Sequence, residues 1–302
     1  MVVMTYEKAS IDQAFEETVS FTNATLDALL PKPSGPEARL LEAMRYAALG
    51  GGKRLRAFFV LQTGNLFGVD RRALGRVAAA VECLHAYSLV HDDLPAMDND
   101  DLRRGQPTVH KAFDEATAIL AGDALLTHAF GLIASPEAHG DPYVRCELIS
   151  RLYAASGHGG MVGGQMMDLA FEGQDPPLPE ITRLQRMKTA ALITFCCEAG
   201  AIMGKSSARP LHVLSAYGQE VGLAYQIADD LLDMEGTEAQ TGKGVRKDAK
   251  RGKATVVSVL GPERARAQAD ALAAQAIAHL EMFDDKADLL RAAARFAIER
   301  NA

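Results

Sequence analysis

Residues 77–105 read VAAAVECLHAYSLVHDDLPAMDNDDLRRG and combine an apolar segment with a dense cluster of aspartates. Apolar residues in the first half recur at intervals of three and four, which predicts a buried helix. Pro95 ends or disturbs this helix, so Asp92 and Asp93 lie on its last turn and Asp98 lies in the following loop. Such carboxylates suit a hard cation like Mg²⁺, which shares its oxygen ligands with substrate phosphates. A solvated acidic loop is the alternative interpretation.

The helical periodicity continues along most of the chain, and the alternating runs typical of strands are scarce. Proline-rich and glycine-rich segments separate the periodic stretches. We therefore predict an all-α fold, a bundle of about ten or more helices around a central active-site cavity. A single domain is expected over residues 1–302. The predicted helices cover residues 11–30, 38–49, 53–67, 71–94, 115–133, 143–156, 180–203, 211–235, 254–260 with 263–281, and 285–299.

The composition argues against several classes of protein. Its 32 basic and 39 acidic side chains give a formal charge of −7, unlike the basic surplus of a general nucleic-acid binder. No run reaches the roughly 18 to 20 apolar residues of a membrane span, and the N-terminus lacks a basic start and an apolar signal core. Few, irregularly spaced cysteines suit a reducing compartment. We expect a soluble, cytoplasmic protein with no integral membrane association and no nucleic-acid partner.

A second aspartate cluster, YQIADDLLDM, occupies residues 225–234 of a predicted helix. Asp229 and Asp233 are four residues apart and share one helix face, which Gln226 joins. Two like charges repel at this spacing, and a bound cation would turn the repulsion into chelation. One such motif alone also fits an exposed acidic face. Two motifs on two helices can face each other, hold several Mg²⁺ ions and neutralise the charge that develops on a diphosphate leaving group.

Basic residues accompany both clusters. The segment GGGKRLR, residues 50–56, places a lysine and two arginines after three glycines at a predicted helix start, where backbone N–H groups and the helix dipole favour an anion. Arg103 and Arg104 directly follow the first cluster, and arginine forks match phosphate oxygens. For any one cation, a solvated surface charge is the alternative. Further candidates for binding an anion or lining the cavity are His85, Gln165, Asp168, Lys188, Lys243 and Lys253.

This ordered set of motifs resembles the short-chain trans-polyprenyl diphosphate synthases, and among them the bacterial farnesyl diphosphate synthases. The resemblance runs over nearly the whole chain, from GGGKRLR through HAYSLVHDDLPAMDNDDLRRG, AGDALLTHAF, GGQMMDL, KTAALI and YQIADDLLD to GKAT and the terminal IERN. It implies a homodimeric helical prenyltransferase whose cavity holds an allylic diphosphate and isopentenyl diphosphate. The implied reaction is a Mg²⁺-dependent ionisation, condensation and elimination that yields farnesyl diphosphate. Three Mg²⁺ ions are expected, with Mn²⁺ as an alternative.

The resemblance also implies roles for individual residues. The expected metal ligands are Asp92, Asp98 and Asp229, supported by Asp93, Asp230 and Asp233. The allylic diphosphate would be held by Arg103, Lys188 and Lys253. The diphosphate of isopentenyl diphosphate would be held by Lys53, Arg56, His85 and Arg104, with the backbone of Gly52. A further lysine of the family pattern is matched by Lys243, and the residues beside the reacting carbons would be Thr189 and Gln226.

Product length depends on the floor of the channel into which the growing chain extends. Tyr87 and Ser88 precede Asp92 by five and four residues, and five helical residues span roughly 7 Å. The ring of Tyr87 is therefore predicted to stop the chain after few isoprene units, which favours a C15 product. Geranyl (C10) and geranylgeranyl (C20) diphosphate remain alternatives.

The sequence departs from the family pattern at a few positions. Ala57 stands where proline is usual, Tyr225 where phenylalanine is usual and Val256 where an aromatic is common, and the chain ends on Ala302 instead of a basic residue. None of these changes removes a metal or phosphate ligand. The alternative functions are those of a terpene cyclase, a head-to-head prenyl synthase, a metal phosphohydrolase and a non-catalytic partner subunit. A cyclase needs no second diphosphate site, and a non-catalytic subunit would be expected to lose aspartates.

Overall fold

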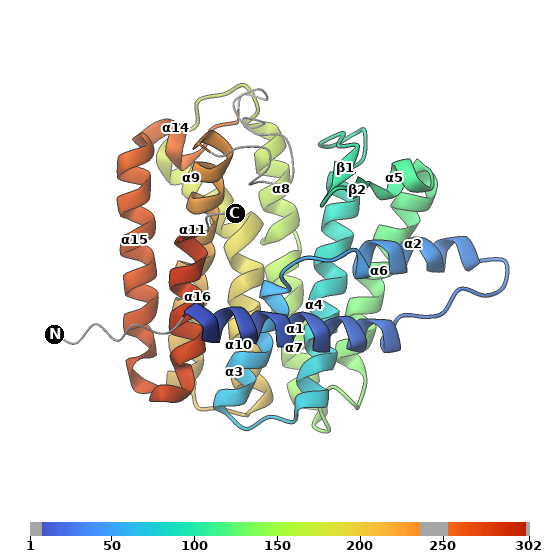
Figure 1. Cartoon of the computed structure of the whole chain (residues 1–302), viewed down its shortest axis with the longest axis horizontal. Coiled ribbons are helices and arrows are strands. Elements are labelled where there is room, and N and C mark those ends of the chain that lie inside the picture. Colours follow the sequence, from blue (N-terminus) through green and yellow to red (C-terminus); the bar gives the residue numbers. More distant parts are fainter. Residues whose placement is uncertain (1–7, 236–252, 300–302) are drawn as a thin grey trace. The chain divides into compact units, whose positions relative to one another are not determined.

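The computed structural model describes residues 8–235 and 253–299, and its regular structure is almost entirely helical (Figure 1). The prediction of an all-α fold is confirmed. In chain order the elements are α1 (Lys8–Leu29), α2 (Ala38–Leu49), α3 (Leu55–Leu66), α4 (Arg71–Asp92), β1 (Leu102–Arg103), β2 (Gln106–Pro107), α5 (Val109–Ala112), α6 (Glu115–Ala134), α7 (Pro142–Ser156), α8 (Met161–Ala170), α9 (Leu178–Gln185), the π-helical turn η1 (Arg186–Ala190), α10 (Ala191–Met203), α11 (Ala208–Glu235), α14 (Val256–Leu260), α15 (Pro262–His279), the 3-10 turns η2 (Leu280–Met282) and η3 (Asp285–Ala287), and α16 (Asp288–Ile298).

The predicted helices begin and end within three residues of the observed ones, but the structure differs in two respects. The segment 180–203 is not one helix, because the π-helical turn η1 separates α9 from α10. The antiparallel hairpin β1–β2 and the helices α5 and α8 were not predicted. The strands are too short to show alternation, and Gly163 with Gly164 lowers the helix propensity of α8.

The chain divides into two compact units. Unit 1 comprises the described parts of residues 1–11, 62–69 and 147–302, and unit 2 comprises residues 12–61 and 70–146. The single domain expected over residues 1–302 stays a prediction.

In unit 2, α4 packs against α6 and α2 (Figure 1). Its first turn is capped by Asp70, whose carboxylate accepts hydrogen bonds from the backbone N–H groups of Arg72 and Ala73. Most apolar residues of α4 between Leu74 and Val90 are buried. The helix that carries the first aspartate cluster is therefore fixed by burial along most of its length.

In unit 1, α11 packs against α10 and α15, and α16 packs against both α11 and α15 (Figure 1). Gly218 and Gly222 permit this close packing, because a side chain at either position would collide with the backbone of Thr194 or Ala190. The hydroxyl of Tyr217 donates to the carbonyl of Leu290 at 2.7 Å and ties α11 to α16. These contacts fix the helix that carries the second aspartate cluster.

Two of the described helices are long and apolar enough to cross a membrane by composition alone, α4 and α6. Burial accounts for α4, because 72% of its most apolar window lies inside the protein. Only 39% of the corresponding window of α6 is buried, and Ile119 and Leu120 are 45% and 55% exposed. The apolar character of α6 therefore needs a second explanation.

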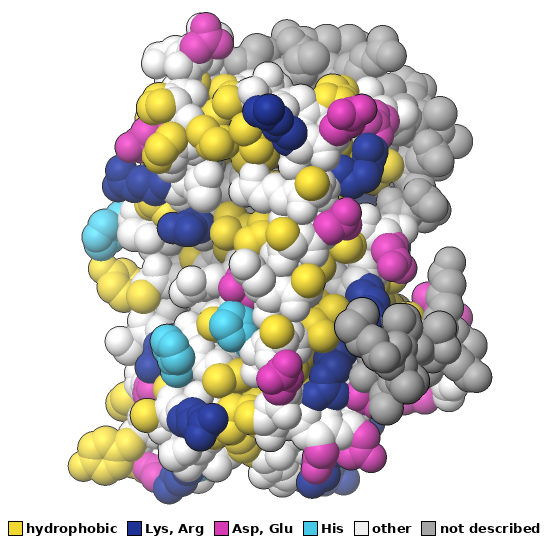
Figure 2. All heavy atoms as spheres, turned by 90° about the vertical axis from the view of Figure 1, so that its left-hand side faces the viewer, with side chains coloured by type: hydrophobic (Ala, Val, Ile, Leu, Met, Phe, Trp, Pro, Cys, Tyr) yellow, Lys and Arg dark blue, Asp and Glu magenta, His cyan; other side chains and the backbone are white. Residues whose placement is uncertain are grey.

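The face of unit 1 that carries α15 has a mixed surface, with basic, acidic and scattered hydrophobic side chains (Figure 2).

Candidate functional site

The first aspartate cluster begins at Asp92, the last residue of α4, and continues in a loop that turns back onto the end of the helix. The backbone N–H of Asp98 donates to the carbonyl oxygen of Asp92 at 2.7 Å, so the two residues are held together as Pro95 led us to expect. Both side chains are partly exposed and accessible from solvent. Two such carboxylates fit Mg²⁺, which is commonly bound by one or two carboxylates together with substrate phosphates and water.

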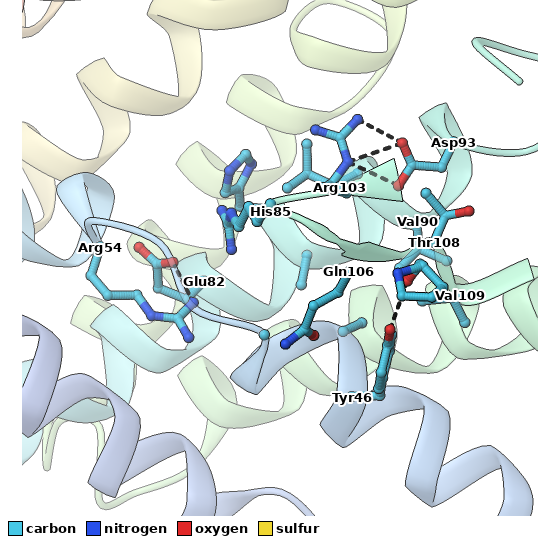
Figure 3. A pocket seen from close by; sticks show the side chains of 16 residues that line it. Tyr46, Arg54, Glu82, His85, Val90, Asp93, Arg103, Gln106, Thr108 and Val109 are labelled. Carbon is cyan, nitrogen blue, oxygen red and sulfur yellow. Dashed lines mark hydrogen bonds and ion pairs between the residues drawn. The ribbon is translucent and has the colours of Figure 1, made fainter. Parts of the chain in front are cut away.

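Asp93 has a different environment from its neighbours. Its carboxylate is buried and accepts hydrogen bonds from the guanidinium of Arg103 at 2.6 to 2.9 Å (Figure 3). Burial raises the pKa of Asp93, and the hydrogen bonds from Arg103 oppose that rise only in part. Asp93 therefore orients Arg103, and its supporting role at a metal ion stays a prediction.

A pocket of about 50 Å³ opens in unit 2 beside this pair (Figure 3). Its wall includes His85 and Arg103, together with Arg104 from the hairpin. The imidazole Nδ1 of His85 is buried and has no hydrogen-bond partner among the residues that the structure describes. Burial, followed by the positive charge of Arg56 and Arg104, lowers the pKa of His85 well below its usual value of 6.5. A buried polar atom without a partner, surrounded by positive charge, indicates a site for an anion.

The glycine segment before α3 forms the edge of this pocket. Gly51 and Gly52 have φ angles of +85° and +110°, which favour glycine. The guanidinium of Arg104 lies directly against Gly52, where any side chain would collide with it, and donates to the carbonyl of Gly51. Lys53 is exposed, and the Nε of Arg56 is buried and has no hydrogen-bond partner within residues 8–235 and 253–299. The structure thus brings Gly52, Arg56, His85 and Arg104 together.

Arg54, a third cation of the same segment, has a structural role instead. Its guanidinium is buried and donates to the carbonyl of Ala48 at 2.7 Å, to Asn23 Oδ1 at 3.0 Å and to Glu82 Oε2 at 3.1 Å. The other oxygen of Glu82 accepts from the backbone N–H of Ala57 at 3.1 Å. The pair joins α1, α2, α3 and α4. Sequence reasoning missed Glu82, although a lone acidic residue in VAAAVECLHAYSLV was a usable signal.

In unit 1, two of the predicted phosphate-binding lysines share one partner. A single carboxylate oxygen of Asp168 accepts from Lys188 Nζ at 2.6 Å and from Lys253 Nζ at 2.7 Å. Burial alone would raise the pKa of Asp168, but the two ammonium groups outweigh it and lower that pKa. The structure therefore brings Lys188 and Lys253 together and adds Asp168, which the sequence marked only as a possible cavity residue.

A chain of hydrogen bonds joins the residues expected beside the reacting carbons. Thr189 Oγ1 donates to Gln226 Oε1 at 2.7 Å, and Gln226 Nε2 donates to Asp230 Oδ1 at 2.9 Å. The second oxygen of Asp230 accepts from Gln185 at 2.9 Å, so this buried carboxylate fixes the orientation of Gln226.

The remaining aspartates of the second cluster, Asp229 and Asp233, lie one helical turn apart on α11 and are partly exposed. Each cluster therefore offers at least two accessible carboxylates, and carboxylates of this kind fit Mg²⁺. Among residues 8–235 and 253–299, no three His, Cys, Asp or Glu side chains lie close enough to hold a metal ion by themselves. Lys243 lies outside the described residues.

Tyr87, the predicted floor of the product channel, is held firmly in place. Its side chain is 8% exposed, and its ring packs edge-to-face on His91 with 5.2 Å between the ring centroids. The Nε2 of His91 lies 3.0 Å from the carbonyl oxygen of Ile119 on α6. Ser88 is turned toward its own helix, since its hydroxyl donates to the carbonyl of His85 at 2.9 Å.

Comparison with known proteins shows the family of this chain. The family model described as polyprenyl synthetase matches residues 37–294. The chain belongs to the polyprenyl synthetase family. It is 45% identical over 297 residues to the farnesyl diphosphate synthase of Escherichia coli (strain K12), covering 96% of this chain and 98% of that protein. It is 44% identical to the farnesyl diphosphate synthase of Geobacillus stearothermophilus, covering 83% of this chain and 84% of the relative.

The fold of this polyprenyl synthetase is also similar to that of solved relatives. The apo crystal structure of an FPP/GFPP synthase from Zymomonas mobilis matches with a TM-score of 0.89 at 52% sequence identity. That match covers 96% of this chain and 100% of the Zymomonas chain. The chain therefore has the fold of an FPP synthase.

Proposed function

We propose that this polyprenyl synthetase is a Mg²⁺-dependent prenyltransferase that condenses isopentenyl diphosphate with dimethylallyl and then geranyl diphosphate to form farnesyl diphosphate. The observation that carries the proposal is the candidate anion site of unit 2. There the Nδ1 of His85 lies amid arginine side chains and has no hydrogen-bond partner in the part of the chain that the structure describes. A second set of cations, Lys188 and Lys253, accompanies the other aspartate cluster. An enzyme that joins the carbon chains of two diphosphate substrates requires two anion sites, whereas a terpene cyclase requires only one.

Each substrate has its own proposed binding residues. Isopentenyl diphosphate is held by Lys53, Arg56, His85 and Arg104, with the backbone of Gly52. The allylic diphosphate is held by Arg103, Lys188 and Lys253. Mg²⁺, when bound by Asp92, Asp98 and Asp229, supplies positive charge to the diphosphate, with three ions expected and Mn²⁺ as an alternative. Supporting positions around the metal are proposed for Asp93 and Asp233.

The protein promotes the reaction by stabilising charge. As the allylic C–O bond breaks, its electron pair passes to the diphosphate oxygen, where Arg103, Lys188 and Lys253 stabilise the negative charge. The oxygens of Thr189 and Gln226 stabilise the allylic cation. The double bond of isopentenyl diphosphate forms the new C–C bond, and the resulting cation loses a proton to the departing pyrophosphate. An enclosed pocket keeps water from quenching the cation, and no nucleophilic serine or cysteine takes part.

Product analysis tests this function. The purified protein is incubated with Mg²⁺, labelled isopentenyl diphosphate and dimethylallyl diphosphate, and the products are dephosphorylated and separated by chromatography. We expect the C15 alcohol to dominate. A dominant C10 or C20 alcohol would change the assigned product within the family, whereas a folded protein without condensation would favour the non-catalytic subunit.

The chain-length floor gives a separate prediction. We expect Tyr87→Ala to shift the main product from C15 to C20 or longer, because removing the buried ring of Tyr87 deepens the channel. Chromatography of the dephosphorylated alcohols measures the shift. Tyr153→Ala, which removes a ring that is 55% exposed, serves as the control and should leave the profile unchanged. An unchanged C15 product from a folded Tyr87→Ala variant would contradict this floor.

The exposed apolar part of α6 supports the proposed homodimer. Ile119 and Leu120 lie on a helix whose apolar window is less than half buried, and apolar surface of this kind marks an interface. We expect Leu120→Lys to convert the dimer to a monomer, measured by size-exclusion chromatography with light scattering. Met282→Lys, which changes an apolar residue that is 41% exposed on η2, should remain dimeric. A dimeric Leu120→Lys variant would exclude this part of α6 from the interface.

We further propose that the protein is located in the cytoplasm.

A further inference from the structure

Asp168 on α8 is the common partner of two lysines from distant parts of the chain. One of its oxygens lies 2.6 Å from Lys188 Nζ, 20 residues along the chain, and 2.7 Å from Lys253 Nζ, 85 residues along. The side chains of Asp168 and Lys253 are each 13% exposed, and that of Lys188 is 27% exposed. The cluster is therefore mostly withdrawn from solvent, and one carboxylate fixes both ammonium groups.

The backbone is built to allow this contact. Gly164 lies one helical turn before Asp168 on α8, and a side chain at this position would collide with the backbone of Lys188. The absence of that side chain lets the π-helical turn η1 approach α8 closely. The Lys188 ammonium can then reach the next turn of α8, where Asp168 lies. The close contact between α8 and η1 therefore makes the ion pair between Lys188 and Asp168 possible.

The proposed function assigns both ammonium groups to the allylic diphosphate, and each of them attracts a phosphate oxygen by its positive charge. An ammonium group has three N–H donors, so Lys188 can bond to Asp168 and to a phosphate oxygen at the same time. Without Asp168 the two like charges would repel, and flexible lysine side chains would occupy several positions.

We propose that Asp168 is a positioning residue for the allylic diphosphate, and that it acts by holding the ammonium groups of Lys188 and Lys253 in one arrangement before the substrate binds. This inference rests on the proposed function, which assigns the two lysines to that diphosphate. The aligned pair matters most when charge develops on the leaving group, because preorganised donors act chiefly on the transition state. Removing the carboxylate of Asp168 has two opposite effects on binding of the substrate in the ground state. The lysines are less ordered, but the carboxylate no longer competes with the diphosphate for their N–H groups.

Steady-state kinetics of Asp168→Asn separate these two effects. We expect kcat to fall about 30-fold, while the KM for dimethylallyl diphosphate changes less than threefold and the KM for isopentenyl diphosphate is unchanged. Glu172→Gln removes a negative charge from an exposed position four residues further along, and it should keep kcat within twofold of the wild type. A twofold or smaller change in the Asp168→Asn variant would overturn the proposal.

A double-mutant cycle tests whether Asp168 acts through the lysines. In a Lys188→Ala, Lys253→Ala background, adding Asp168→Asn should lower kcat less than threefold further. A full 30-fold further loss would show that Asp168 acts independently and would overturn the proposal. Asp168→Glu keeps the carboxylate, so it should retain more activity than Asp168→Asn, and it replaces that variant if the asparagine form fails to fold. A glutamate variant as slow as the asparagine variant would contradict a role based on charge.

Measuring the wild type in the same assay tests the proposed function separately from the role of Asp168. A wild type that forms no prenyl product would overturn the proposed function and the role of Asp168 with it. An active wild type together with an unaffected Asp168→Asn variant would overturn the role of Asp168 alone.

Discussion

Asp92→Ala and Asp229→Ala are each expected to lower kcat for prenyl transfer about 1000-fold. Each change removes one of the carboxylates proposed to bind Mg²⁺ from an aspartate cluster, so Mg²⁺ binds more weakly there. A metal ion that stabilises a leaving group contributes several kcal/mol, and about 4 kcal/mol corresponds to about 1000-fold in rate. Radiochemical assay at saturating substrate and 1 to 20 mM Mg²⁺ measures the loss.

Asp101→Asn is the matched control for the first cluster. Asp101 belongs to the same acidic run, but its side chain is 73% exposed and pairs with Lys111 at 2.9 Å. We expect this variant to keep kcat within threefold of the wild type, whereas treatment of the wild type with EDTA should abolish activity until Mg²⁺ is restored. Retention of more than a tenth of wild-type activity in folded Asp92→Ala would exclude Asp92 as a required ligand.

Arg54→Ala and Glu82→Ala are expected to have the largest effect on stability. Each change leaves an uncompensated charge at a pair whose side chains are both 3% exposed, and such losses lower the free energy of unfolding by about 3 to 5 kcal/mol. Glu82→Ala also leaves the backbone N–H of Ala57 without its partner. Equilibrium unfolding in urea, followed by circular dichroism, measures both changes.

The exposed pair formed by Arg39 and Asp114 provides the control. Its side chains are 58% and 47% exposed, so Arg39→Ala should lower the free energy of unfolding by less than about 1 kcal/mol. If Arg54→Ala were no more destabilising than Arg39→Ala, the contacts of the Arg54–Glu82 pair with α1, α2, α3 and α4 would not contribute to stability as we expect.

Periodicity along the sequence was sufficient for most of the fold, because long apolar repeats report directly on which helix face is buried. The region 180–203 shows the limit of that information. Its apolar pattern is continuous, and the π-helical turn at residues 186–190 lies where this segment packs against α8 and α11. The helix α8 was missed for a related reason, since the glycines that weaken its local propensity are the residues that permit close contact with η1.

The candidate site was predictable where a role follows from local spacing. Asp92 and Asp98 could be expected to come together because Pro95 lies between them, and the backbone hydrogen bond agrees. Burial and pairing were not predictable in the same way. Lys53 and Arg54 are adjacent in sequence, yet one is exposed and the other is buried against residues 28 and 31 positions away. Such differences depend on distant segments that no local pattern describes.

The π-helical turn η1 sets the rotation of two neighbouring side chains about the helix axis. Lys188 bonds to Asp168 on α8, whereas Thr189, the next residue, bonds to Gln226 on α11. One residue of α-helix corresponds to about 100° of rotation, so removing a single residue before Lys188 would turn both side chains away from their partners. The length of this segment is therefore constrained as strictly as the identity of its residues, and variation among active homologues should take the form of substitution without insertion or deletion.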